Sequence, residues 1–270
     1  MPDFQTPDGV TLGYQIDGDG EPLLLVSGQG ADRRMWDGVR PDFAARYRVV
    51  TWDHRGTGVS DKPERPPYST RGFAADAVAL LDHLGIGRAH AYGISMGGRI
   101  VQWLGVEHPD RVGALVLGAT TPGNAHGVPR PAEVDALMAD PPSDPDERVR
   151  FHARIMVGPA YVAAHPEYLD RMREAAERPI PAFAQRLHYR ASEEHDSWDR
   201  LPEISAPTLV IHGDDDRVNV TANAPLLAGR IPGAELHLVA GGRHGYFEEF
   251  RPEASSVVLG FLGRHPLDLP

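Results

Sequence analysis

Short, continuous runs of apolar residues recur along the chain. The clearest is Leu23-Leu24-Leu25-Val26, and such a run is typical of a β-strand that is covered on both faces. Seven segments have the character of strands: 9–17, 22–27, 47–52, 88–93, 114–118, 208–212 and 234–239. The turn-forming residues Asp17-Gly18-Asp19-Gly20 separate the first two of them.

Apolar residues with helical spacing occur between these runs. Val78, Leu81 and Leu84 lie three residues apart, which predicts a helix over 73–84. Further helices are predicted over 97–107, 222–230 and 252–262. Strands that alternate with helices predict an α/β fold, with a mostly parallel sheet and helices on both of its faces. In such a sheet the catalytic and ligand-binding residues lie at the carboxyl ends of the strands.

The alternation stops between residues 120 and 206, where proline, arginine, histidine and acidic residues are frequent. Three apolar stripes with helical spacing follow one another there: Val149, Ala153 and Met156; Tyr168, Met172 and Ala175; and Phe183, Leu187 and Ala191. We interpret 120–206 as a helical lid, inserted over the strand ends of a core domain that comprises 1–119 and 207–270. The alternative is that these stripes pack onto the core in the ordinary way.

Composition narrows the class of protein. Of 270 residues 41% are apolar and 24% charged, which is ordinary for a globular protein, and the net charge is −11. Because no block of basic residues is present, we expect no nucleic-acid partner. No apolar run is long enough to cross a membrane, and the first residues lack a secretory signal, so we expect a cytoplasmic protein. The absence of cysteine excludes disulfides and a thiol nucleophile.

The segment Gly93-Ile94-Ser95-Met96-Gly97 lies between a predicted strand and a predicted helix. A serine flanked by glycines at such a junction is held in a sharp turn, where larger side chains would collide with the neighbouring strand and helix. The turn exposes the Ser95 hydroxyl at the strand end, where a base can activate it. The alternative is a tight turn in which the serine is incidental.

Two later loops contain the partners that a serine nucleophile needs. In this architecture the expected chain order is serine, then an acid after a late strand, then a histidine after the last strand. Gly213-Asp214-Asp215-Asp216-Arg217-Val218 follows one such strand, and Gly241-Gly242-Arg243-His244-Gly245 follows the final one. We therefore expect Ser95 as nucleophile and His244 as general base. The residues alone leave the choice among the three aspartates open.

These motifs resemble those of the α/β-hydrolase superfamily over nearly the whole chain. Gly93-Ile94-Ser95-Met96-Gly97-Gly98 resembles its nucleophile turn, and Gly242-Arg243-His244 its histidine loop. Asp53-His54-Arg55-Gly56-Thr57-Gly58-Val59-Ser60 is similar to a structural signature of the family. In the acid loop the family uses the third aspartate after the glycine, which implies Asp216. The resemblance also implies a sheet of the eight-stranded type with a lid.

The resemblance implies an oxyanion site built from backbone N–H groups. Where the family usually has His-Gly, this chain has Ser27-Gly28-Gln29-Gly30. By position the donors are the N–H of Gln29 and the N–H of Met96, which follows the nucleophile. Because backbone donors do not depend on side-chain identity, the changed loop can retain this function.

Two shorter matches, Gly30-Ala31-Asp32 with Met35-Trp36-Asp37 and Gln102-Trp103-Leu104-Gly105, are similar to the 3-oxoadipate enol-lactonase branch. The likeness implies a serine esterase or lactonase that acts on a small-molecule substrate through an acyl-enzyme. We expect it to need neither a metal nor an organic cofactor. A serine at position 95 disfavours the carboxylate-nucleophile chemistries of the fold, namely those of dehalogenases and epoxide hydrolases.

Several alternatives stay open on the sequence. The same three residues could serve a thioesterase, a hydrolase of carbon–carbon bonds or a perhydrolase. A ligand-binding receptor with little turnover is an alternative from another class, since a complete set of catalytic residues does not measure a rate.

Overall fold

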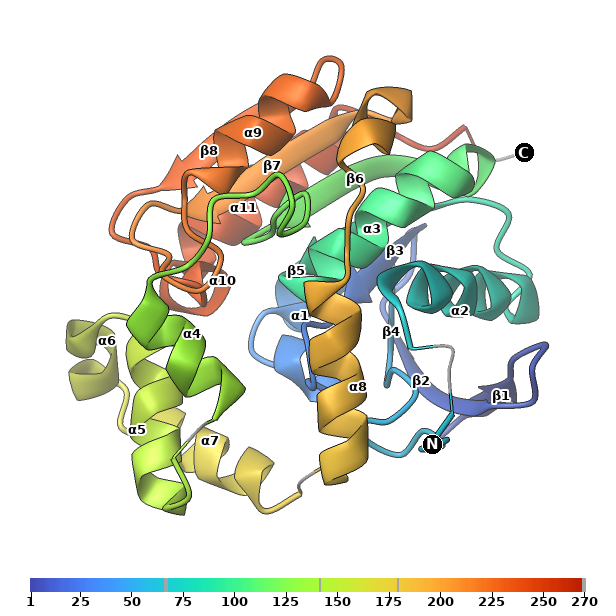
Figure 1. The fold of residues 1–270 in the computed structure, drawn as a ribbon. Helices are drawn as coiled ribbons and strands as arrows, with labels where there is room; N and C mark the ends of the chain where they lie inside the picture. Colours follow the sequence, from blue (N-terminus) through green and yellow to red (C-terminus); the bar gives the residue numbers. More distant parts are fainter. Residues whose placement is uncertain (66–67, 141, 179, 269–270) are drawn as a thin grey trace.

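The computed structural model describes the chain except for residues 66–67, 141, 179 and 269–270. Its described part contains one eight-stranded sheet in the order β1-β2-β4-β3-β5-β6-β7-β8 (Figure 1). The strands are β1 Asp3–Gln5, β2 Thr11–Asp17, β3 Glu21–Val26, β4 Tyr47–Trp52, β5 Ala89–Ile94, β6 Val112–Gly118, β7 Thr208–Gly213 and β8 Glu235–Val239. Strands β3 to β8 pair in parallel, whereas β1 and β2 pair antiparallel with their neighbours.

The predicted α/β fold with a mostly parallel sheet is confirmed. Each of the seven predicted strand segments corresponds to a strand, and no end is shifted by more than two residues. Strand β1 has no counterpart in the sequence prediction, because it has three residues and buries only Phe4.

Helices cover both faces of the sheet. In the core they are α1 Arg40–Ala44, α2 Thr70–His83, α3 Met96–Glu107, α9 Asn223–Arg230, α10 Tyr246–Glu249 and α11 Arg251–Gly263, with short 3-10 turns at Arg33–Trp36, Pro109–Arg111 and Trp198–Glu203. Leu24 and Val26 of β3 pack in one hydrophobic cluster with α2, α3 and α9. Leu23 and Leu25 pack in a second cluster with α1, α10 and α11. The continuous apolar run of this strand follows from having a cluster on each face.

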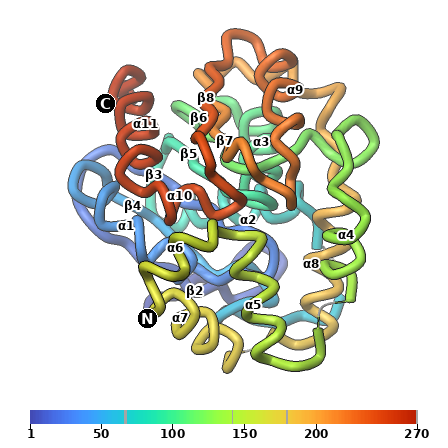
Figure 2. The backbone as a smooth tube through the Cα atoms, turned by 90° about the vertical axis from the view of Figure 1, so that its left-hand side faces the viewer, coloured from blue at the N-terminus to red at the C-terminus, as the bar shows by residue number. Residues whose placement is uncertain are grey.

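Five helices lie between β6 and β7. They are α4 Ala132–Ala139, α5 Pro145–Met156, α6 Pro159–Ala164, α7 Glu167–Ala176 and α8 Ala182–Glu193. Figures 1 and 2 show them grouped at one end of the molecule. The three predicted stripes lie on α5, α7 and α8, and positions 141 and 179 of the predicted lid 120–206 lie outside the described residues. The division into core and lid stays a prediction. Among the helices described, none is long and apolar enough to span a membrane.

A buried ion pair fastens the loop after β4 to α2. The Arg55 guanidinium donates to Asp76 at 2.6 and 2.9 Å, and both side chains are buried. Arg55 also donates to Asp8 at 2.9 Å, but the Asp8 side chain is 43% exposed. Removing one partner of a buried pair leaves an uncompensated charge inside the protein, whereas an exposed partner contributes little.

We therefore expect Asp76→Ala to lower the free energy of unfolding by about 3–5 kcal/mol, measured by urea denaturation. Asp8→Ala is the matched control, since it removes the exposed partner of the same arginine, and we expect it to cost less than about 1 kcal/mol. Equal losses in the two variants would contradict this account of the loop.

Candidate active site

Ser95 lies in a strained turn between β5 and α3. Its φ is 60° and its ψ is −119°, a backbone conformation that residues with a Cβ rarely adopt. A Cβ on Gly93 would overlap the backbone of Gly97, and a Cβ on Gly97 would overlap the carbonyl oxygen of Val26 in β3. The glycines are therefore needed for the close approach of strand, turn and helix, as the sequence motif predicts.

Hydrogen bonds to the end of β6 and the loop that follows it hold this turn in place. The Ser95 N–H donates to Gly118 O of β6 at 2.9 Å, and Thr120 Oγ1 donates to Ser95 O at 2.8 Å. The Ser95 hydroxyl oxygen accepts a bond of 3.4 Å from Asn219 Nδ2. The side chain thus points toward the loop that follows β7.

Asp216 is the buried acid of that loop. Its Oδ1 accepts from the N–H groups of Val218 at 2.8 Å and Asn219 at 3.1 Å. Its Oδ2 lies 2.8 Å from His244 Nδ1 and 3.1 Å from His212 Nε2. Burial alone would raise the pKa of Asp216, but the attraction of His244 and the hydrogen bonds from both histidines outweigh it and hold the pKa well below its usual range.

The two neighbouring aspartates have other surroundings. Asp214 and Asp215 are exposed. Asp214 accepts from the N–H of Gly241 at 2.6 Å, and Asp215 accepts from Arg243 Nε at 3.0 Å. Neither holds an imidazole, so the geometry favours Asp216 over both.

His244 lies in the loop after β8 and is 5% exposed. Because a carboxylate can only accept, the bond to Asp216 requires a proton on His244 Nδ1 and leaves Nε2 free to take one. Within the described residues no hydrogen bond joins His244 to Ser95, whose hydroxyl contacts Asn219 instead. Asn219 links the two halves of the site, because its backbone N–H bonds Asp216 while its side chain bonds Ser95.

The predicted oxyanion donors are the N–H groups of Met96, the residue after Ser95, and of Gln29, the residue after Gly28. Met96 is the first residue of α3, and the first N–H groups of a helix have no partner within it. Gly28 packs against the turn, since a Cβ there would lie 3.5 Å from both Ile94 O and Ser95 Cβ. The N–H of the next residue, Gln29, donates to no protein acceptor among the residues described.

His188 of α8 connects the helices between β6 and β7 with the loops that follow β3 and β4. It donates from Nε2 to Arg55 O at 2.8 Å, and its Nδ1 accepts from the N–H of Gly30 at 3.4 Å. Burial lowers the pKa of His188 to about 4, against the raising effect of its bond to the Arg55 carbonyl. Burial and the nearby His188 lower the pKa of His54 to about 3. Both imidazoles are therefore neutral at pH 7.

Neutral buried histidines make the fold sensitive to acid. Above pH 6.5 neither the folded nor the unfolded state protonates them, but between pH 6.5 and about 4 the unfolded state alone binds protons. Stability is thus lost as the pH falls through this window. From pH 7.5 to 5.0 we expect each histidine to lower the free energy of unfolding by about 2 kcal/mol, measured by urea denaturation. His188→Gln removes one such group, and an unchanged pH dependence in this variant would contradict the assignment.

Sequence reasoning did not find Asn219, His212 or His188. These residues stand outside the glycine motifs. His188 and Gly30 are 158 residues apart, and Asn219 and Ser95 are 124 residues apart. The positions of His212, four residues before Asp216, and of Asn219, three residues after it, are local signals that could have been used.

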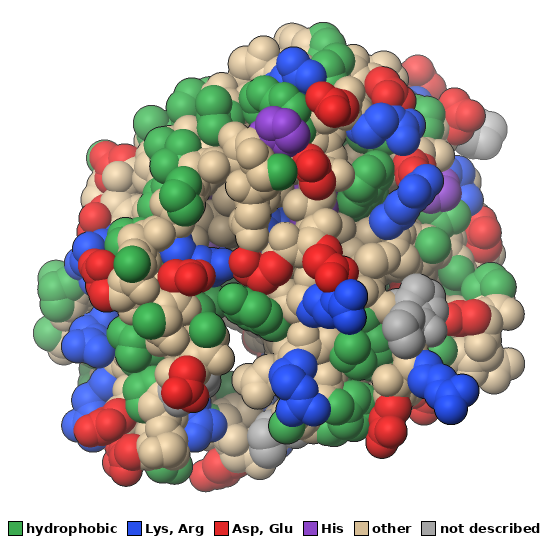
Figure 3. Space-filling model, viewed as in Figure 1, with side chains coloured by type: hydrophobic (Ala, Val, Ile, Leu, Met, Phe, Trp, Pro, Cys, Tyr) green, Lys and Arg blue, Asp and Glu red, His purple; other side chains and the backbone are tan. Residues whose placement is uncertain are grey.

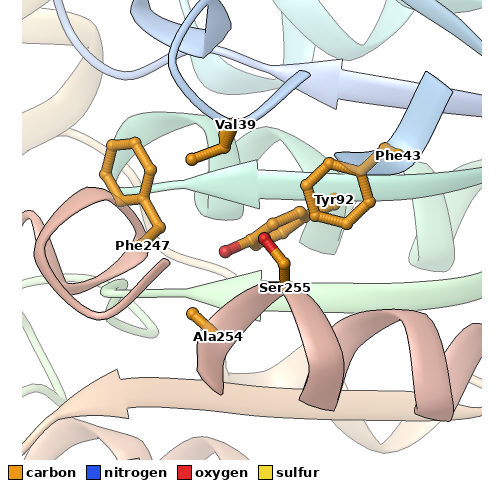
Figure 4. Close-up of a pocket in the computed structure, with 6 residues that line it drawn as sticks. All are labelled: Val39, Phe43, Tyr92, Phe247, Ala254 and Ser255. Carbon is orange, nitrogen blue, oxygen red and sulfur yellow. The ribbon is translucent and has the colours of Figure 1, made fainter. Parts of the chain in front are cut away.

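A small gap lies in the core between α1, α10 and α11 (Figure 4). It is lined by Val39, Phe43, Tyr92, Phe247, Ala254 and Ser255. It leaves no room for a water molecule and belongs to the core packing. In the part of the chain that the structure describes, no group of three or more histidine or acidic side chains is arranged to hold a metal ion.

Comparison with known proteins identifies the class of protein to which this chain belongs. A family model for the alpha/beta hydrolase fold matches residues 21–250. The chain belongs to the α/β-hydrolase family and is a hydrolase of that fold, as the resemblance predicts.

Several known proteins are similar to this chain over most of their length. RutD of Caulobacter vibrioides, provisionally assigned as a carbamate hydrolase, is 32% identical over 95% of this chain and 96% of its own. 3-Oxoadipate enol-lactonase 2 of Acinetobacter baylyi is 29% identical over 88% of each chain. The structure of Est816, described as an N-acyl homoserine lactone degrading enzyme, is 31% identical with a TM-score of 0.82, and the match covers 96% of this chain and 100% of that one.

Proposed function

We propose that this chain is a serine hydrolase that cleaves a carboxylic ester or lactone of a small molecule. The observation that carries the proposal is the buried Asp216–His244 pair. The loop that contains Asp216 also contacts the hydroxyl of the strained Ser95, through Asn219. The enol-lactonase and Est816 relatives support a lactone or ester as the substrate.

The reaction has two steps. His244 Nε2 takes the proton from Ser95 Oγ as this oxygen attacks the substrate carbonyl, and Asp216 stabilises the resulting imidazolium. The N–H groups of Gln29 and Met96 stabilise the negative oxygen of the tetrahedral intermediate. His244 then protonates the leaving alcohol, or the ring oxygen of a lactone. A water molecule activated by His244 releases the acid from Ser95.

The helices between β6 and β7 are proposed to cover the bound substrate. Figure 3 shows that one face of the molecule is hollowed between α8 and the group of α4, α5 and α7. His188 connects α8 with the loop that contains Gln29, so this helix is suited to shape the site around the reacting carbonyl.

Covalent labelling tests this proposal. A fluorophosphonate reacts with activated serines, so we expect wild-type protein to gain one adduct, assigned to Ser95 by peptide mass spectrometry. Ser95→Ala should gain none, whereas Asp8→Ala should be labelled like the wild type. An unlabelled wild-type protein, or an adduct on another serine, would overturn the proposal.

A panel of p-nitrophenyl esters, lactones, thioesters and carbamates then identifies the bond that is cleaved. Preference for an ester or lactone supports the proposal. Preference for a thioester, a carbamate or a carbon–carbon bond would replace that part of it. Labelling of Ser95 without turnover of any compound would favour the ligand-binding receptor.

A further inference from the structure

Asn219 occupies a central position that the proposed reaction does not yet use. It is buried, and its backbone N–H donates to Asp216 Oδ1 at 3.1 Å. Its carbonyl accepts from His212 Nε2 at 2.6 Å. Its side-chain amide faces the nucleophile, with Nδ2 3.4 Å from Ser95 Oγ.

Two further contacts determine which way this amide points. Asn219 Nδ2 donates to Ala119 O at 2.7 Å, and a carbonyl oxygen can only accept. On the other side Oδ1 lies 3.3 Å from an Arg99 guanidinium nitrogen, which can only donate. Both partners require the orientation in which an N–H group, and not the oxygen, is presented to Ser95.

Arg99 is itself a buried cation of the nucleophile helix α3. In the described residues its guanidinium bonds the Ser192 hydroxyl at 2.7 Å, the Thr121 hydroxyl at 3.1 Å and Asn219, and it meets no carboxylate. Burial lowers its pKa to about 10, so it stays charged at neutral pH. A nearby positive charge polarises the Asn219 amide and strengthens its N–H group as a donor.

We propose that Asn219 is a further catalytic residue, which donates a hydrogen bond to Ser95 Oγ, and that Arg99 is the positioning residue that orients its amide. The proposal rests on the proposed function, in which Ser95 is the nucleophile. With one lone pair of Oγ engaged by Asn219, the O–H of Ser95 is left to donate to His244.

The hydrogen bond matters most when Oγ carries negative charge. As the acyl-enzyme breaks down, water adds to the acyl carbon and gives a proton to His244. The C–Oγ bond then breaks, its electron pair passes to Oγ, and His244 returns the proton to that atom. A donor at Oγ stabilises this charge, and it does so again when Oγ loses its proton during attack. Asn219 donates a hydrogen bond throughout and transfers no proton.

The test compares Asn219→Ala with Asn223→Ala. Asn223 is a buried asparagine of the same region, and its side chain bonds the backbone of Val128 and Val220 but not Ser95. For Asn219→Ala we expect fluorophosphonate labelling of Ser95 and kcat for a p-nitrophenyl ester to fall about 10–100-fold, with KM changed less than about threefold. For Asn223→Ala we expect rates close to wild type, with any loss confined to thermal stability.

Asn219→Asp tests the contact with Ser95 through the pH dependence of kcat/KM, which a purely structural role of Asn219 would leave unchanged. The replacement has nearly the same shape, but it puts a carboxylate beside Ser95 in place of the N–H group. Its negative charge should raise the pKa of the catalytic base, so the acid limb of the kcat/KM profile should move to higher pH. An unshifted profile would count against contact between this side chain and the reacting groups.

The outcomes separate the two proposals. If wild-type Ser95 is not labelled, the proposed function fails and this inference falls with it. If the wild type is labelled and Asn219→Ala is labelled equally fast, the inference fails while the proposed function stands. Equal slowing in Asn219→Ala and Asn223→Ala would show general loosening of the loop, and it would also overturn the inference.

Discussion

Replacing Asp216 with asparagine is expected to lower kcat about 10⁴-fold, the size of effect found when the acid of such a triad becomes an amide. Val218 and Asn219 direct backbone N–H groups at Oδ1, so an amide would keep its oxygen there. Its NH₂ group would then face His244 Nδ1. That nitrogen would have to accept, which moves the imidazole proton to Nε2 and removes the base from Ser95.

Asp215→Asn is the matched control for this variant. It makes the same chemical change one residue earlier, in a carboxylate that is exposed and bonded to Arg243. We expect its kcat to stay within about twofold of wild type, since an exposed ion pair contributes little. Steady-state hydrolysis of a p-nitrophenyl ester measures both. Wild-type activity in Asp216→Asn, together with a larger loss in Asp215→Asn, would show that Asp215 and not Asp216 is the catalytic acid.

Asp214, Asp215 and Asp216 show the limit of what the local sequence pattern can predict. Adjacent residues of one type in one turn have the same propensities, so the sequence alone leaves the acid open. The family resemblance selects Asp216, and the structure supplies a physical difference among the three. Two N–H groups and two imidazoles surround Asp216, whereas Asp214 and Asp215 are exposed.

Burial explains which elements the sequence predicted well. Strands β3, β5, β6 and β7 have helices on both sides, and all their residues are buried except Glu21 at the start of β3, so their apolar runs are easily recognised. Helices α4 and α6 are short, and α4 buries only Val134 while α6 buries no residue. They therefore carry no stripe for a periodicity argument to detect.

Side chains that act over long distances in sequence form the part that could not be predicted. Asn219 meets Ser95 across 124 residues, and Arg99 meets Asn219 across 120. Nothing in the spacing around either residue encodes these contacts, because they depend on the parallel order of β5, β6 and β7. A motif specifies the strained turn at Ser95, but the groups that contact its hydroxyl are determined by tertiary structure.

The second large effect is expected at the nucleophile turn itself, from Gly97→Ala. A Cβ at this position would overlap the carbonyl oxygen of Val26 and lie 2.8 Å from its carbonyl carbon and 2.9 Å from Ser27 O. These are backbone atoms at the end of β3, in the middle of the sheet, so rotation of a side chain cannot relieve the overlap. We expect the free energy of unfolding to fall by about 3 kcal/mol or more. That is a large share of the roughly 5–15 kcal/mol that stabilises a typical domain.

Gly260→Ala in α11 is the control, because a Cβ there meets open space and alanine is favoured over glycine inside a helix by about 1 kcal/mol. The two variants add the same methyl group, so urea denaturation should show opposite signs, with Gly97→Ala destabilised and Gly260→Ala slightly stabilised. Gly97→Ala should also lose ester hydrolysis while still folded at low urea, since relief of the overlap displaces the Ser27–Gln29 loop from Ser95. A variant as stable and as active as wild type would mean that the turn and β3 do not approach each other as closely as the structure has them.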